Sequence, residues 1–274
     1  MSDRLERGAV AAARRIVVKV GSSSISGDNA GQIGPLVDAL ADAHARGVEV
    51  VLVSSGAIAT GMPFLSLDAR PDDLATQQAA ASVGQNILIF RYQDALRRFG
   101  IVAGQVLLTA GDLEHETARS NAQRAMDRLL SLRILPIVNE NDTVATHEIR
   151  FGDNDRLAAL VAQLVGADLL VLLSDVDALY TRDPRLPGAE PIDVVPFGDA
   201  LDGVEIGSTG RSGVGTGGAE TKVSAARIAA EAGVGVLITA TGKVGRALAA
   251  GDVGTWFEPG ERPVSTMTGG IPVI

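Results

Sequence analysis

Short apolar runs alternate with longer amphipathic segments along almost the whole chain. The apolar runs predict strands at residues 15–20, 48–53, 102–108, 134–138, 168–173, 192–195 and 234–239. Helical spacing of apolar residues predicts helices at residues 34–46, 74–99, 117–132, 153–165 and 219–232. Several strands are apolar at successive positions, which indicates burial on both faces. The pattern predicts an α/β fold, a three-layer α/β/α sandwich around a mainly parallel sheet.

Polar and small residues follow several of the predicted strands. Lys19 ends the first strand, Ser54–Ala57 follow the second, and Ser174 and Asp175 follow the fifth. In open parallel sheets, ligands bind outside the carboxyl ends of the strands. The backbone N–H groups of Ser54–Ala57 could receive an anion at a helix start, although a simple serine N-cap fits the same residues equally well. A lysine at a strand end is also often merely solvated.

Residues 139–164 read NENDTVATHEIRFGDNDRLAALVAQL and crowd carboxylates and carboxamides after an apolar strand. Turn formation would use one or two of them, because Asn and Asp bond their own backbone. This many carboxylate and carboxamide side chains favour a site for a charged small molecule or a metal. Residues 143–151 alternate in polarity and predict a small exposed hairpin.

A glycine-rich stretch, GVEIGSTGRSGVGTGG, precedes the helix expected at residues 219–232. Gly213, Gly215 and Gly218 match the spacing G-x-G-x-x-G, but no strand precedes them and no acidic residue follows at the distance that a dinucleotide site needs. A loop that wraps phosphates, with Lys222 near the helix start, is one interpretation. A surface loop with a solvated lysine is the other.

Composition and charge narrow the chemistry. The 274 residues include no cysteine, which excludes disulfides and thiolate catalysis, and the three histidines lack the spacing of metal ligands. A net charge of −9 argues against nucleic acid or an anionic membrane as partner. The sequence offers neither a good signal peptide nor an apolar run of about 20 residues, so we expect a cytoplasmic protein.

Seven segments together resemble the amino acid kinase family, and within it the branch that phosphorylates free glutamate. They are VVKVGSS, VVLVSSGAIATG, ASVGQ, GQVLLT, ILPIVNENDTVATHEIRFGDND, LLVLLSDVDALYTRDPR and GVGTGGAETKVSAA, in family order. The resemblance implies a kinase domain at residues 15–265 between tails at 1–14 and 266–274. Many bacterial relatives carry a further C-terminal PUA domain, and this sequence matches a short form without it.

The resemblance implies transfer of the γ-phosphoryl group of MgATP to the side-chain carboxylate of L-glutamate. The product is L-glutamyl 5-phosphate, and the reaction is the first step of proline biosynthesis. Lys19 and Lys222 would be catalytic, with Asp155 orienting both lysines. Mg²⁺ would be bound mainly through the nucleotide. The implied substrate-binding residues are Ser55, Gly56, Ala57, Asn139, Asp142 and Asn154. The implied nucleotide-binding residues are Lys19, Ser174, Asp175, Thr216, Gly217, Gly218, Ala219, Glu220, Thr221 and Lys222.

The resemblance also implies feedback inhibition by L-proline and a homo-oligomer, either a dimer or a tetramer. Two other functions stay open. The chain could be another small-molecule kinase of the family, acting on acetylglutamate, aspartate, carbamate or a phosphate monoester, which the NENDTVATHEIRFGDND segment argues against. It could also be a non-catalytic amino-acid sensor, but a sensor has no need for two lysines and an aspartate that handle phosphate.

Overall fold

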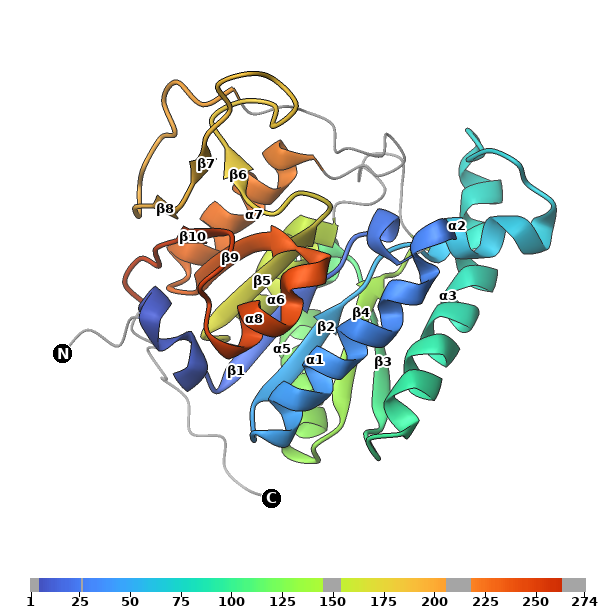
Figure 1. Ribbon diagram of the computed structural model, residues 1–274. Coiled ribbons are helices and arrows are strands. Elements are labelled where there is room, and N and C mark those ends of the chain that lie inside the picture. The colour runs from blue at the N-terminus through green and yellow to red at the C-terminus, as the bar shows by residue number, and fades with distance from the viewer. Residues whose placement is uncertain (1–4, 26, 145–153, 206–217, 263–274) are drawn as a thin grey trace.

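The computed structural model describes residues 5–25, 27–144, 154–205 and 218–262 (Figure 1). Within them, eight strands form one sheet in the order β3-β4-β2-β1-β5-β9-β10-β8. The first six are parallel, β10 runs antiparallel to β9, and β8 is parallel to β10. The strands are β1 (Arg15–Lys19), β2 (Glu49–Val53), β3 (Ala103–Leu108), β4 (Leu135–Glu140), β5 (Leu169–Ser174), β8 (Val194–Val195), β9 (Gly235–Ala240) and β10 (Thr255–Phe257). A separate antiparallel pair joins β6 (Leu179–Tyr180) and β7 (Pro191–Ile192).

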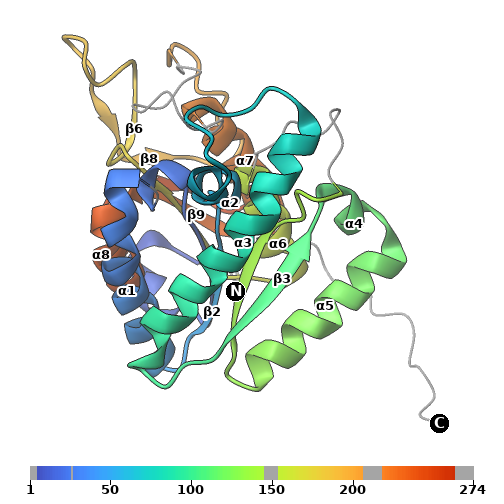
Figure 2. The same ribbon diagram turned by 90° about the vertical axis from the view of Figure 1, so that its right-hand side faces the viewer.

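Helices cover both faces of the sheet (Figures 1 and 2). One face packs against α1 (Ile33–Ala45), α3 (Leu74–Arg97) and α8 (Val244–Ala249), and the other against α5 (Glu116–Ser131), α6 (Asn154–Leu164) and α7 (Ala219–Glu231). The shorter α-helices are α2 (Ala57–Gly61) and α4 (Ala110–Glu114). The 3₁₀ segments are η1 (Arg7–Ala12), η2 (Ser22–Ser24), η3 (Gly27–Gln32), η4 (Met62–Leu65) and η5 (Thr241–Lys243).

The central strand β1 explains why the apolar runs are continuous. Its neighbours in the sheet are β2 and β5. Ile16 and Val18 point into the core that contains Leu40 of α1, whereas Val17 points into the core that contains Val161 of α6. Each buried side chain of this size contributes about 1.5–3 kcal/mol to stability. The strand must be apolar at successive positions because both of its faces lie in a core.

The sequence predictions of fold class and main elements are confirmed. The five predicted helices occur within two residues of the expected bounds, and α3 begins where the Asp73 carboxylate accepts a hydrogen bond from Thr76 N–H at 2.8 Å. The prediction of one strand at residues 192–195 is wrong, because the chain divides at Asp193 into β7 and β8, which belong to different sheets. The predicted hairpin at 143–151 falls almost wholly on residues 145–153, outside the described residues.

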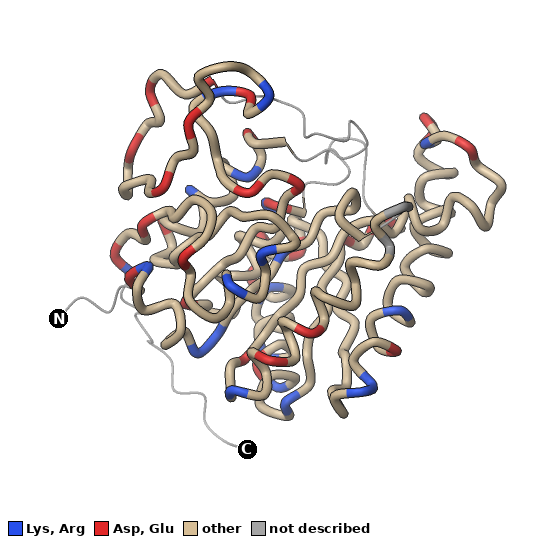
Figure 3. Tube along the Cα trace, viewed as in Figure 1, with Lys and Arg blue, Asp and Glu red and all other residues tan. Residues whose placement is uncertain are grey.

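The fold gathers the polar strand ends along one rim. The parallel strands β1, β2, β4, β5 and β9 all end at the upper edge of the sheet in Figure 1, where α2, α6 and α7 begin. Loops around β6, β7 and β8 rise above this rim and are mainly acidic (Figure 3), with eight acidic and two basic residues between positions 175 and 205. Positive charge at the rim must therefore come from particular side chains. No helix in the described part of the chain is long and apolar enough to cross a membrane.

Candidate active site

Two lysines from different parts of the chain meet on one aspartate. Lys19 ends β1, Asp155 lies in the first turn of α6, and Lys222 lies in the first turn of α7. Lys19 Nζ is 2.6 Å from Asp155 Oδ1, and Lys222 Nζ is 3.1 Å from Asp155 Oδ2. All three are buried, with 4%, 1% and 7% of their surface exposed. We call these three residues the lysine–aspartate cluster.

The cluster carries an excess of one positive charge in a buried place. Burial by itself would raise the pKa of Asp155, but the charges of Lys19 and Lys222 and a hydrogen bond from Thr221 outweigh it and hold that pKa well below its usual range. Thr221 Oγ1 lies 2.9 Å from Asp155 Oδ2. Buried charges are costly unless they are paired. The cluster places two ammonium groups beside one carboxylate, an arrangement suited to an anionic ligand.

The start of α7 adds to this attraction. Gly218 is the extended N-cap of the helix, and Ala219, Glu220 and Thr221 form its first turn. The first N–H groups of a helix have no partner within the helix, and its dipole favours an anion at this end. The predicted nucleotide-binding residues Thr216 and Gly217 lie outside the described residues.

The turns after β1 and β2 pack tightly against each other. Gly56 precedes α2 with φ of 94°, and a Cβ atom built on it would lie 3.2 Å from Ser22 Cβ. Both the backbone conformation and the space therefore favour glycine at this position. Ser55 and Ala57, on either side of it, are buried. The substrate-binding residues predicted here thus form a close-packed turn beside the loop that follows Lys19.

Helices α2 and α3 approach so closely that glycine is needed on both. A Cβ atom on Gly61 would lie 1.9 Å from Ala80 O, and one on Gly84 would lie 1.8 Å from Ala57 O. Neither position leaves room for a side chain. The glycines of the segments GAIATG and ASVGQ therefore set the distance between α3 and the turn that holds Ser55.

Asn139, near the end of β4, has its carboxamide held at both ends. Its Nδ2 donates a hydrogen bond to Gln85 Oε1 on α3, and its Oδ1 accepts one from Glu140 N–H at 3.0 Å. Only 1% of the residue is exposed. Asn139 therefore joins the end of β4 to α3, a contact that sequence reasoning did not anticipate.

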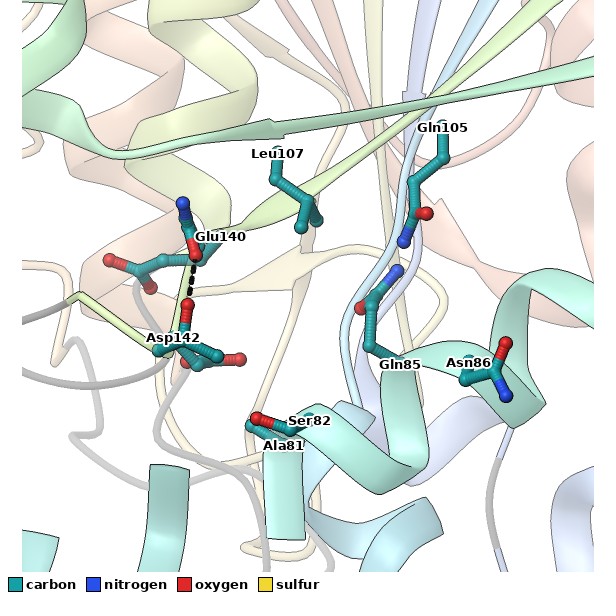
Figure 4. A pocket seen from close by; sticks show the side chains of 10 residues that line it. Ala81, Ser82, Gln85, Asn86, Gln105, Leu107, Glu140 and Asp142 are labelled. Carbon is teal, nitrogen blue, oxygen red and sulfur yellow. Dashed lines mark hydrogen bonds between the residues drawn. The ribbon is translucent and has the colours of Figure 1, made fainter. Parts of the chain in front are cut away.

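A pocket of about 280 Å³ opens between α3, β3 and the residues after β4 (Figure 4). We call it the α3–β4 pocket. Gln85 and Gln105 point toward one another on one side of it, and Glu140 and Asp142 lie on the other. Burial and the neighbouring charge of Glu140 raise the pKa of Asp142 to about 7, although the charge of Arg70 opposes this shift. The pocket can thus present either a neutral or an ionised carboxyl group near neutral pH.

Asn154 begins α6, directly before Asp155, and is 5% exposed. Within the described residues, its buried Oδ1 atom has no hydrogen-bond partner. An unpaired buried acceptor costs about 1–3 kcal/mol. A donor supplied by a ligand would remove that cost.

The amino-acid sequence is similar to a known protein family over most of its length. Residues 14–240 match the sequence model of the amino acid kinase family. The chain belongs to this family. It is 78% identical over 253 residues to a glutamate 5-kinase of Clavibacter michiganensis subsp. michiganensis, covering 92% of this chain and 97% of that protein. A glutamate 5-kinase of Leifsonia xyli subsp. xyli is 75% identical, with 93% and 95% covered. One of Salinispora arenicola is 58% identical, with 93% of this chain but 70% of the longer relative covered.

Solved structures agree on the fold of this amino acid kinase. The structure titled carbamate kinase from Giardia lamblia bound to AMP-PNP matches with a TM-score of 0.65 over 91% of this chain and all of that chain. The two sequences are 15% identical, so this likeness concerns the fold alone. The expected α/β/α sandwich of the amino acid kinase family is confirmed.

A further polar group, at the end of β9, was missed by the sequence predictions. Ser174 and Asp175 lie where expected after β5, with Ser174 Oγ 3.3 Å from Asp175 Oδ1. Thr241 Oγ1 lies 3.2 Å from the Ser174 carbonyl and 3.0 Å from Ser24 Oγ, so it links the end of β5 to the segment η2 that follows β1. Thr241 could have been found by the rule that identified Ser174, because it lies two residues after the predicted strand at 234–239.

The acidic side chains in the described part of this amino acid kinase are not grouped as metal ligands. In the described ranges, no group of three or more His, Asp or Glu side chains is arranged to hold a metal ion. Asp177, the second acid after β5, is instead bonded to Lys243 Nζ at 2.8 Å and to the Tyr180 hydroxyl at 2.8 Å.

Proposed function

We propose that this amino acid kinase transfers the γ-phosphoryl group of ATP to the side-chain carboxylate of L-glutamate. The products are L-glutamyl 5-phosphate and ADP, and the reaction serves as the first step of proline biosynthesis. The observation that carries the proposal is the buried lysine–aspartate cluster, which occurs in a chain 78% identical to a glutamate 5-kinase of nearly the same extent.

The reaction brings two anions together, and the positive charges of the lysine–aspartate cluster would reduce the repulsion between them. In phosphoryl transfer the protein mainly positions the reactants and stabilises charge on the moving group. Lys19 and Lys222 would offset the repulsion between the attacking carboxylate and the γ-phosphate. Asp155 holds both ammonium groups in place before any ligand binds. No general base is required, because the side-chain carboxylate of glutamate is already ionised at neutral pH.

The nucleotide would lie between α7 and the end of β5. The phosphates would bind the N–H groups of Gly218, Ala219, Glu220 and Thr221 together with the preceding residues Thr216 and Gly217. Ser174 and Asp175 would border the nucleotide on the β5 side. Mg²⁺ bound through the β- and γ-phosphates would supply further charge neutralisation. The residues present suit a bound MgATP, because the ammonium groups of Lys19 and Lys222 would lie near its γ-phosphate.

The amino-acid end of glutamate would bind near the turn after β4. Its α-ammonium group can donate charge-assisted hydrogen bonds to Asp142 and to the unpaired Oδ1 of Asn154. Its α-carboxylate would bind Ser55 and the neighbouring N–H groups of Gly56 and Ala57, with Asn139 behind the site. N-acetylation removes the ammonium charge and adds bulk, so these acceptors favour free glutamate over acetylglutamate.

Inhibition by L-proline belongs to the same proposal. L-Proline shares the α-amino and α-carboxylate groups of glutamate, so it should inhibit by competing for the same contacts. Inhibition that glutamate does not relieve would contradict an overlapping site.

We also propose that the chain assembles as a homodimer or homotetramer, which sedimentation velocity would test.

The decisive experiment traps the acyl phosphate with hydroxylamine. The purified chain would be incubated with MgATP and, in separate reactions, with L-glutamate, N-acetyl-L-glutamate, L-aspartate or carbamate, and the Lys222→Met variant would give the background. We expect hydroxamate from glutamate at least tenfold above the other acceptors. Preferential hydroxamate formation from acetylglutamate or aspartate would assign another substrate in the same family, and none from any acceptor would contradict phosphorylation of these carboxylates.

A further inference from the structure

Gln85 contacts the candidate site although it lies in the middle of a helix. Its Oε1 accepts a hydrogen bond from Asn139 Nδ2, and Asn139 Oδ1 accepts the Glu140 N–H at 3.0 Å. Glu140 leads through Asn141 to Asp142. The chain of contacts therefore runs from α3 through Asn139 to the turn that carries the carboxylates of the α3–β4 pocket.

The two contacts of Asn139 specify one orientation of its carboxamide. An asparagine side chain can rotate by half a turn and exchange its donor and acceptor. The Glu140 N–H requires an oxygen on one side, and Gln85 Oε1 requires a donor on the other. Without Gln85, the Glu140 contact would select between the two orientations with no help from α3, and the end of β4 would lose this hydrogen bond to the helix.

The same face of α3 also contacts the other substrate turn. The Tyr92 hydroxyl lies 3.0 Å from Ser54 Oγ, and Gly84 lies against the backbone of Ala57. Gln85 and Tyr92 are seven residues apart, which places them on one side of the helix. Helix α3 is thus a common support for the turns after β2 and β4.

We propose that Gln85 is a positioning residue for amino-acid recognition. It fixes Asn139 and, through Glu140, the position of Asp142, without touching the substrate. This rests on the proposed function, because Asp142 is taken to bind the ammonium group of glutamate. Loss of the Gln85 acceptor should weaken glutamate binding and leave both the nucleotide contacts and the lysine–aspartate cluster unchanged.

The test compares three variants. Gln85→Met removes the acceptor while keeping the length and helix propensity of the side chain, and Gln85→Glu keeps an acceptor for Asn139. Asp94→Ala is the matched control, since Asp94 is exposed on the same helix and does not line the α3–β4 pocket. We expect Gln85→Met to raise the KM for glutamate roughly tenfold, with kcat and the KM for ATP within about twofold of the wild type. Gln85→Glu should recover most of the loss, and Asp94→Ala should behave as the wild type.

The possible failures are distinguishable. If the wild type makes hydroxamate from glutamate and Gln85→Met keeps a normal KM for glutamate, the positioning proposal is overturned while the proposed function stands. An equal rise in KM for ATP and glutamate, together with a lower melting temperature, would make Gln85 a general structural residue and would also overturn it. If the wild type uses a different amino-acid acceptor, the proposed function fails, and the same three variants test the positioning role with that acceptor.

Discussion

Asp155 is buried and Asp142 is half-buried, and their pKa values shift in opposite directions. Asp155 lies between two lysines of its own chain, and their charges lower its pKa. Asp142 lies beside another acid, Glu140, and its pKa is raised to about 7. The groups that would act on phosphate are thus paired before any ligand arrives. The groups that would bind the amino acid depend on a ligand to complete their pairing.

The two carboxylates also give opposite pH dependences of folding stability. Because the pKa of Asp155 is lower in the folded state, its contribution is present above its unfolded value of about 4 and is lost as the pH falls through the folded value. Because the pKa of Asp142 is higher in the folded state, the folded protein binds more protons between about pH 4 and 7. Stability is therefore lost through Asp142 as the pH rises across that window.

The largest effect is expected from Asp155→Ala. The substitution leaves two buried lysines without their carboxylate, and removal of one partner of a buried ion pair costs about 3–5 kcal/mol of stability. The lysines should also lose their alignment, so kcat should fall. Denaturant unfolding and steady-state kinetics on the same preparation would check both effects. Asp127→Ala, on the exposed surface of α5, is the control. Unchanged stability in Asp155→Ala would contradict the buried ion pairs.

The second effect concerns the transition state. Lys222→Ala should lower kcat by roughly a hundredfold, which corresponds to about 3 kcal/mol of lost stabilisation, because its charge is most useful as the phosphoryl group moves. Arg227→Ala removes a positive charge from the exposed side of the same helix and should leave kcat unchanged. A double Asp155→Ala/Lys222→Ala variant should lose less than the sum of the single effects, since the residues act as a unit. Full additivity would contradict a shared cluster.

The fold could be predicted from the sequence because its main strands are buried on both faces. Ile16, Val17 and Val18 all need apolar surroundings, and this produces the continuous runs that mark a strand. Periodicity needs more residues than β6, β7, β8 and β10 contain, since these strands have only two or three residues each. Their positions depend on tertiary pairing and could not be predicted from local pattern.

The site was only partly predictable from the residues alone. The strand-end rule found Lys19 and Ser174, but Asp155 entered through family resemblance, because nothing local links it to Lys222, 67 residues later. Gln85 was missed for a different reason. It is a polar residue in the middle of a helix, a position that usually faces solvent, and its contact with Asn139 spans 54 residues.

A smaller effect, on glutamate binding, is expected from substitution of Asp142. Asp142→Asn should raise the KM for glutamate about thirtyfold, or about 2 kcal/mol, because it removes one side of a charge pair with the substrate. The kcat should change little, since the contact is remote from the phosphoryl group. Discrimination against acetylglutamate should also weaken. A variant that loses thermal stability but keeps its KM would make Asp142 a turn residue and remove it from the site.

The smallest effect is a difference in pH dependence between the KM for glutamate, which involves Asp142, and kcat, which involves Asp155. Binding of the glutamate ammonium group requires ionised Asp142, so the KM for glutamate should rise as the pH falls below about 7, reaching roughly tenfold near pH 6 and below. Asp155 stays ionised over this range, so kcat should stay nearly constant. The measurement is kcat and KM for glutamate between about pH 5.5 and 8 with saturating MgATP. Asp142→Asn should abolish the dependence. Glu140→Gln should move its midpoint to lower pH, because the charge of Glu140 is one cause of the raised pKa. A midpoint that Glu140→Gln leaves in place would show that another group titrates, and the contrast with Asp155 would then lose its physical basis.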